Sequence, residues 1–141
     1  MEIKIKQNKQ YQDIAKKIIR EELPELRDVK VAYLASQKEK KSKRKIVFAE
    51  CVKVNLDEYG WCCPYDFMII VYEPHVAGFT DEQMRILLLH ELMHIGIDQD
   101  GEEPRYYVVP HDIEDFRAII DRYGLDWQRG EDDAERREPE Q

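Results

Sequence analysis

The sequence predicts a small α+β domain in which an apolar helix packs against a short sheet, with a further helix at each end of the chain. Three observations support this class. Residues 10–23 have helical apolar periodicity, three β-like runs follow between residues 29 and 72, and a strongly apolar helical segment begins near residue 80. Strands followed by segregated helices are typical of α+β domains. We expect a sheet of three strands, or slightly more, against the apolar helix.

The first helix is expected over residues 10–23, where Tyr11, Ile14, Ala15 and Ile18 fall on one helical stripe. Pro24 should end it, because the residue before a proline is disfavoured in a helix. Strands are expected at residues 29–35, 45–54 and 66–72. The last, DFMIIVY, is almost continuously apolar. Such a run is typical of a strand that is covered on both faces.

The apolar helix has the clearest start signal in the chain. Thr80 and Gln83 form the pattern of a capping box, and the run MRILLLHELMHIGI follows. We expect this helix to be buried on nearly every side and to stop at Gly96 or in the polar run 98–101. A last helix is expected over residues 112–123, with Gly124 as its C-terminal cap.

Composition favours one soluble domain. The chain has 141 residues, of which 43% are hydrophobic and 37% charged, and its mean hydropathy is −0.69. We expect a single domain over residues 1–128 and a disordered acidic tail over 129–141. No stretch reaches the roughly 20 apolar residues of a membrane span, so no membrane partner is expected. The first ten residues lack the apolar core of an export signal, and three cysteines form an odd set. A cytoplasmic location, in a bacterial host, is therefore predicted.

The net charge of −8 is unevenly distributed along the chain. The run from Lys38 to Lys45 holds six basic residues and one acidic residue. Because it lies between two apolar segments, a solvated hairpin loop is the simpler interpretation. Contact with nucleic acid or with an acidic partner is the alternative.

The apolar helix contains the motif His90-Glu91-Leu92-Met93-His94. Histidines four residues apart lie on one face of a helix, so both imidazoles can reach one ion. A zinc ion lowers the pKa of its bound water to about 7. Glu91 is then placed to act as the general base toward that water. The motif predicts a zinc-dependent hydrolase.

Catalytic zinc sites use three protein ligands and keep one position open. His111 is the favoured third ligand, because it opens the expected last helix, where the helix dipole keeps an imidazole neutral. Asp112 and Glu114 could orient a ligating imidazole from behind. The alternatives for the ligand itself are His75, Asp100 and Glu114. Asp100 fits poorly, since the extended metal motif needs a glycine at position 97 and the chain has Ile97 there.

The runs LLLHELMHIGID and PHDIEDFRAIIDRYG, the latter followed by DW after one leucine, resemble the phage metallopeptidase family of HExxH proteins. They are also broadly similar to minimal zincins such as the SprT-like and ImmA-like peptidases. The resemblance covers residues 66–127. It implies a small zincin-like fold, zinc at His90, His94 and His111, and a gene carried by a phage or prophage. Unlike larger zincins, the chain has no obvious separate substrate-binding domain.

Substrate contacts can be expected at three further residues. Tyr106 and Tyr107 could steady a developing oxyanion through a phenol, or pack as aromatic side chains under a loop. His75 could donate or accept a hydrogen bond on the substrate side. By analogy with zincins, the strand at residues 66–72 would lie at the sheet edge and bind an extended peptide through main-chain hydrogen bonds.

The function expected from the sequence is a phage- or prophage-encoded zinc endopeptidase that acts on a peptide or protein. Two alternatives stay open. The chain could be a zinc-containing binding or regulatory module without peptidase activity, or a zinc amidase that acts on a non-peptide or cell-wall amide. The intact Glu91 favours an enzyme, because a purely structural site would not need it.

Overall fold

The computed structural model describes residues 5–99, 101 and 103–111. The chain divides into two compact units, residues 1–109 and 110–141. All helices and strands described below belong to the first unit. The helix predicted at 112–123, the domain boundary at residue 128 and the acidic tail fall outside the described residues and stay predictions.

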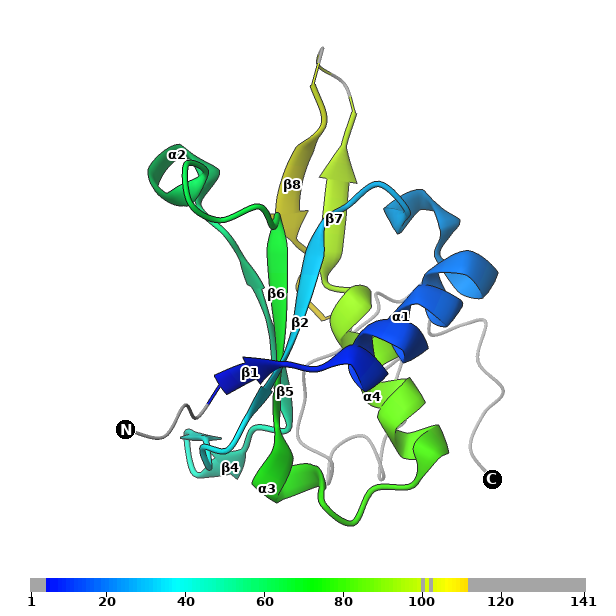
Figure 1. Cartoon of the computed structure of the whole chain (residues 1–141), viewed down its shortest axis with the longest axis vertical. Coiled ribbons are helices and arrows are strands. Elements are labelled where there is room, and N and C mark those ends of the chain that lie inside the picture. The colour runs from blue at the N-terminus through cyan, green and yellow to red at the C-terminus, as the bar shows by residue number, and fades with distance from the viewer. Residues whose placement is uncertain (1–4, 100, 102, 112–141) are drawn as a thin grey trace, which may run out of the picture. The chain divides into compact units, whose positions relative to one another are not determined.

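The first unit is an α+β domain, as the sequence predicts, and Figure 1 shows its elements. No helix among the described residues is long and apolar enough to cross a membrane. In chain order the elements are β1 (Ile5–Gln7), α1 (Lys9–Glu22), a 3₁₀ turn η1 (Pro24–Leu26), β2 (Val31–Ser36), β3 (Lys41–Ser42), β4 (Lys45–Ile46), β5 (Ala49–Lys53), α2 (Leu56–Tyr59), β6 (Phe67–Tyr72), α3 (Glu73–Val76), α4 (Asp81–Leu92), β7 (Ile95–Asp98) and β8 (Arg105–Val108).

The main sheet has four strands in the order β1-β2-β6-β5. Strand β6 runs parallel to β2 and antiparallel to β5, so it is central. This explains the continuous apolar run: Phe67, Ile69 and Val71 are fully buried on one face. The expectation that residues 66–72 form the sheet edge is therefore wrong. Among the described strands, the edge next to β6 is β5.

Helices α1 and α4 pack on each other, α1 packs on β2 and α4 packs on β5. Asn8 caps α1 by accepting a hydrogen bond from the Tyr11 amide at 3.0 Å. The predicted stripe of α1 is confirmed where Tyr11, Ala15 and Ile18 are buried. A side-chain ion pair between Arg85 and Glu22 also joins the two helices. As predicted, α1 ends before Pro24.

The run predicted as one strand over residues 45–54 forms two strands, β4 and β5, with Val47 and Phe48 between them. Strand β4 pairs with β3 in a hairpin of exposed residues. Its two turn residues, Lys43 and Arg44, have φ angles of 51° and 67°. A two-residue hairpin turn with positive φ at both positions matches the right-handed twist of the strands. The basic run at residues 38–45 therefore contains β3 and the turn of a separate small hairpin, and this hairpin is not continuous with β5.

Helix α4 begins where the sequence predicts, with the complete capping box of Thr80 and Gln83. It ends earlier than expected, at Leu92, because residues 95–98 form strand β7 and pair with β8. Gly96 faces Tyr107 in this pair, and a Cβ there would lie 2.3 Å from the Tyr107 ring. The helix is also not buried all round, since Ile86 is 53% exposed.

We predict that Thr80→Ala lowers the free energy of unfolding by about 1 kcal/mol, because it removes the hydroxyl that accepts from the Gln83 amide at 3.2 Å. Urea unfolding of the two proteins measures the difference. Thr80→Ser keeps the hydroxyl and is the control. Equal stability of wild type and Thr80→Ala would show that the capping box contributes nothing to α4.

Candidate metal centre

The HExxH motif straddles the C-terminal end of α4. His90 and Glu91 occupy the last turn, and His94 lies just beyond the C-cap residue Met93. The Met93 amide donates to the Leu89 carbonyl at 3.0 Å, and the His94 amide donates to the Glu91 carbonyl at 3.1 Å. These bonds continue the turn far enough to keep the histidines on one side. Their ring centroids are 5.1 Å apart, with an angle of 72° between the rings.

His94 is oriented by the backbone of Val109, which follows β8. The Val109 amide donates to the His94 carbonyl at 2.6 Å, and His94 Nδ1 lies 2.6 Å from the Val109 carbonyl oxygen. A carbonyl oxygen only accepts hydrogen bonds, so Nδ1 carries the proton. In this tautomer Nε2 is the nitrogen that could ligate a metal ion, and the ring cannot rotate without losing the bond.

His111 is the third histidine of the candidate site. One nitrogen each from His90, His94 and His111 lies within 4.8 Å of the others. His90 and His111 are exposed and His94 is half-buried. This histidine cluster could hold a metal ion.

Glu91 differs from its neighbours because it is only 5% exposed. It belongs to the same buried stripe of α4 as Leu88 and Leu92. Burial raises the pKa of Glu91 to about 7, His94 lowers this pKa, and the charge of Glu50 raises it. A carboxyl group with a pKa near neutrality can both accept and return a proton at physiological pH.

Glu50, on β5, is a site residue that the sequence analysis missed. Its carboxylate accepts hydrogen bonds from Lys40 Nζ at 2.5 Å and from the Tyr72 hydroxyl at 2.8 Å. Burial raises the pKa of Glu50, but these two bonds outweigh it and hold the pKa below the usual range. Glu50 is therefore a fixed negative charge near Glu91. In the sequence, Glu50 is one polar residue of an alternating strand pattern, and this pattern does not indicate that it lies near Glu91.

His75 is positioned apart from the metal cluster by a different partner. It lies in α3, and its Nε2 accepts a hydrogen bond from the Lys40 backbone amide at 3.1 Å. It is not a member of the ligand cluster found among the described residues. Its suggested contact with substrate stays a prediction.

The two tyrosines of β8 have packing contacts. The Tyr106 ring meets the Phe67 ring edge-on, with centroids 5.9 Å apart. Burial and the charges of Asp66 and Asp28 raise the pKa of Tyr106. Tyr107 lies over Gly96 and is 49% exposed. These contacts are those of the packing alternative, and an oxyanion role for either phenol stays a prediction.

Other residues considered for the site are only partly described. Asp100, Asp112 and Glu114 lie outside the described residues, so their roles stay predictions. Cys51, Cys62 and Cys63 are free thiols. Burial and the charge of Glu91 raise the pKa of Cys51 to about 12, so this thiol is protonated and is not a ligand in that state.

The donor set fits a borderline metal such as zinc. Imidazole nitrogen suits zinc, copper, iron and nickel, whereas calcium and magnesium prefer oxygen. Three histidines leave a position open for water or substrate, as in catalytic zinc sites. The hydrogen bond from His94 to Val109 supplies the outer contact that such ligands commonly make.

Comparison with known proteins gives one match. The family model described as "Putative phage metallopeptidase" matches residues 3–135, which is nearly the whole chain. No curated protein and no solved structure matches the chain. The family description suggests a metal-dependent hydrolase, in agreement with the histidine cluster. Because this match covers most of the chain, the chain belongs to the "Putative phage metallopeptidase" family.

Proposed function

We propose that the protein is a zinc-dependent endopeptidase with a zincin-like active site, in which His90, His94 and His111 hold the metal and Glu91 is the general base. One observation carries this proposal. A buried carboxyl group, Glu91, lies in the same turn as His90 and is followed by His94, within a cluster of three histidine ligands.

The metal would supply the electrophile. Zinc bound by three histidines lowers the pKa of water to about 7 and polarises a carbonyl group. The chain's own residues supply the rest. His94 presents Nε2 because Val109 holds Nδ1. His90 and His111 are exposed, so this side of the cluster is open to solvent and to a substrate.

Glu91 would accept the proton of the attacking water and return it to the leaving amine. Its burial supports both steps, because a carboxyl group with a pKa near 7 is a stronger base than an exposed one. Burial also removes solvent that would weaken its interaction with the reacting water. Burial is the main cause of the raised pKa of Glu91, and the negative charge of Glu50 adds to it.

A peptide substrate is favoured by the sheet beside the motif. Strand β5 packs against α4 and β8, and among the described strands it pairs only with β6. An unpaired strand edge can bind an extended peptide through main-chain hydrogen bonds. We assign this role to β5, in place of the strand at residues 66–72.

The family description and the three free thiols support a phage or prophage protein that works in the reducing cytoplasm of a bacterial host.

We predict close to one zinc ion per chain in the purified protein, and its loss in His94→Ala, because one of three ligands is removed. His111→Ala should also weaken zinc binding. His75→Ala is the matched control, since His75 hydrogen-bonds to Lys40 outside the cluster. Metal analysis by mass spectrometry measures the content, and the thermal shift on adding zinc tests the link to folding. Greater zinc loss in His75→Ala than in His111→Ala would reassign the third ligand.

We predict that Glu91→Gln retains zinc and the fold but lowers the hydrolysis rate by about 10²- to 10⁴-fold, because the amide cannot accept a proton. The melting temperature should not fall, since the change removes a buried carboxyl group that is costly to ionise. A peptide library incubated with both proteins and read by mass spectrometry measures cleavage.

Glu82→Gln is the control for this variant, because Glu82 is exposed in the first turn of the same helix. Its cleavage rate should match that of wild type. If Glu91→Gln cleaves as fast as wild type, Glu91 is not the base. If wild type binds zinc but cleaves no peptide, the alternative of a zinc-containing binding module replaces the peptidase.

A further inference from the structure

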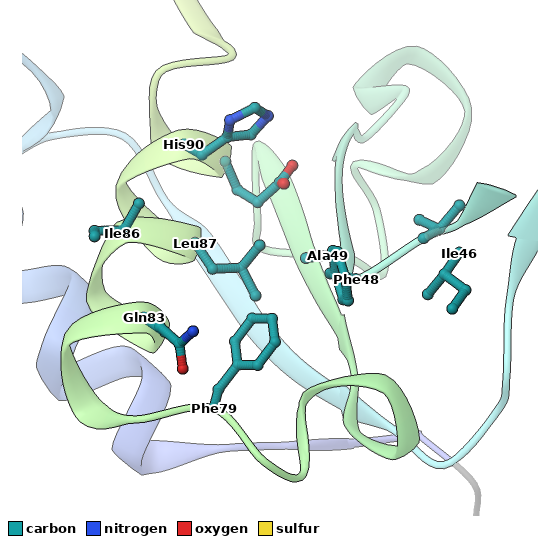
Figure 2. Close-up of a pocket in the computed structure, with 10 residues that line it drawn as sticks. Ile46, Phe48, Ala49, Phe79, Gln83, Ile86, Leu87 and His90 are labelled. Atoms are coloured by element: carbon teal, nitrogen blue, oxygen red, sulfur yellow. The ribbon is translucent and has the colours of Figure 1, made fainter. Parts of the chain in front are cut away.

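An apolar pocket of about 490 Å³ opens beside His90 and Glu91. Figure 2 shows it between α4 and the chain segment that joins β4 to β5. Its volume falls within the ~300–1,000 Å³ typical of ligand pockets. No role has been assigned so far to the apolar side chains that line it.

One wall of the pocket is a stripe along α4. Gln83, Ile86 and Leu87 line it, followed one turn later by His90 and Glu91. These positions are i, i+3, i+4, i+7 and i+8, so they share one face of the helix. The face that carries the proposed catalytic residues is therefore continuous with an apolar face toward the start of the helix. A side chain in this pocket would lie directly beside the reacting bond.

The opposite wall comes from β4, the start of β5 and the segment that joins them. Ile46, Phe48 and Ala49 line it, and Phe79 closes the end away from His90, as Figure 2 shows. The Phe48 and Phe79 rings are 5.2 Å apart between centroids. The Tyr72 amide donates to the Phe48 carbonyl at 2.9 Å, which anchors this segment to β6.

Three large apolar side chains at the rim of the pocket are exposed. Ile46 is 50% exposed, Phe48 is 41% exposed and Ile86 is 53% exposed. Single exposed apolar residues are common, but several around one hollow mark a binding surface. The gain from covering them would come from apolar burial, so the occupant should be a large apolar group.

A cationic hairpin borders the same pocket. The segment from Lys38 to Lys45 carries six basic residues against one acidic residue, a local charge of +5 in a chain of net charge −8. Lys40 is paired with Glu50. The side chains of Lys41, Lys43 and Lys45 are exposed, and Lys45 directly precedes the pocket residue Ile46. Acidic groups on an occupant would meet a positive potential on this side.

We propose that this pocket binds one large apolar side chain next to the scissile bond of an extended peptide, and that acidic residues of the same peptide lie along the β3–β4 hairpin. The substrate class is thus a peptide segment with an apolar anchor beside acidic residues. This inference rests on the proposed peptidase function and adds its specificity.

The first test compares cleavage of a peptide library by wild type and by Ile86→Lys. Wild type should prefer Leu, Ile, Met or Phe at one fixed position beside the cleaved bond, with Asp or Glu on one flank. Ile86→Lys should lower kcat/KM for these peptides by roughly tenfold or more, because it places a charge in the pocket. Zinc content should not change. Leu56→Lys is the matched control, since Leu56 is 43% exposed on α2 and does not line the pocket.

The second test addresses the acidic flank. Lys41→Glu combined with Lys45→Glu should abolish the preference for acidic residues and keep the preference for the apolar anchor. Lys9→Glu combined with Lys17→Glu is the control, because it makes the same change in net charge on exposed positions of α1. In wild type, added salt should reduce the acidic preference. An unchanged acidic preference in the hairpin variant would overturn this part of the proposal.

Binding measured without hydrolysis separates this inference from the peptidase proposal. The probes are fluorescein-labelled decapeptides with a central Leu and two flanking Glu, or with a central Ala, and anisotropy is measured on Glu91→Gln. The Leu peptide should bind at least tenfold more tightly, and adding Ile86→Lys should remove the difference. Cleavage without any apolar preference would overturn the pocket inference while the peptidase stands. Selective binding of the Leu peptide, without cleavage by wild type, would overturn the peptidase proposal while the pocket inference stands. If there is neither selective binding nor cleavage, both proposals are overturned.

Discussion

The site depends on the pair of hydrogen bonds between His94 and Val109. They join the end of α4 to the segment after β8, since one bond uses the His94 backbone and the other its imidazole ring. The first bond fixes the backbone at the end of α4, and the second sets the tautomer of His94. The β7–β8 hairpin therefore helps to build the candidate metal centre, because its pairing returns the chain to the end of α4, where Val109 meets His94.

The C-terminal end of α4 places the carboxyl group of Glu91 in a buried position, where an apolar side chain would make the fold more stable. Glu91 shares a buried stripe with Leu88 and Leu92, and a buried carboxyl group is costly to ionise. The charge of Glu50 increases this cost, while His94 reduces it. Such local cost is common at functional sites, where the surrounding fold provides the stability. Here the capped start of α4 and its contacts with α1 and β5 provide it.

In the proposed function, the arrangement of the sheet determines where a peptide substrate would lie. Because β6 is central, the edge strand beside α4 is β5 among the described strands, and the segment leading into β5 lines the apolar pocket. The break at Val47 and Phe48 separates β5 from the cationic hairpin, so apolar and basic surfaces adjoin on one side of the motif. Lys40 links the basic run to two other elements. Its backbone amide donates to His75 on α3, and its ammonium group binds Glu50 on β5.

The sequence alone determined the fold class, the first helix, the start of α4 and the pair of histidines with Glu91, because these depend on local periodicity and capping. It also named His111 as a ligand candidate, although only the fold brings that residue to the other two. The sequence could not reveal the end of α4 at Leu92, since the competing β7–β8 pairing involves residues about ten positions apart. The edge position of β5, the partner carbonyl of Val109 and the charge of Glu50 beside Glu91 were decided by tertiary structure. Each of them is a contact between distant segments, and a single sequence has no local signal for such contacts.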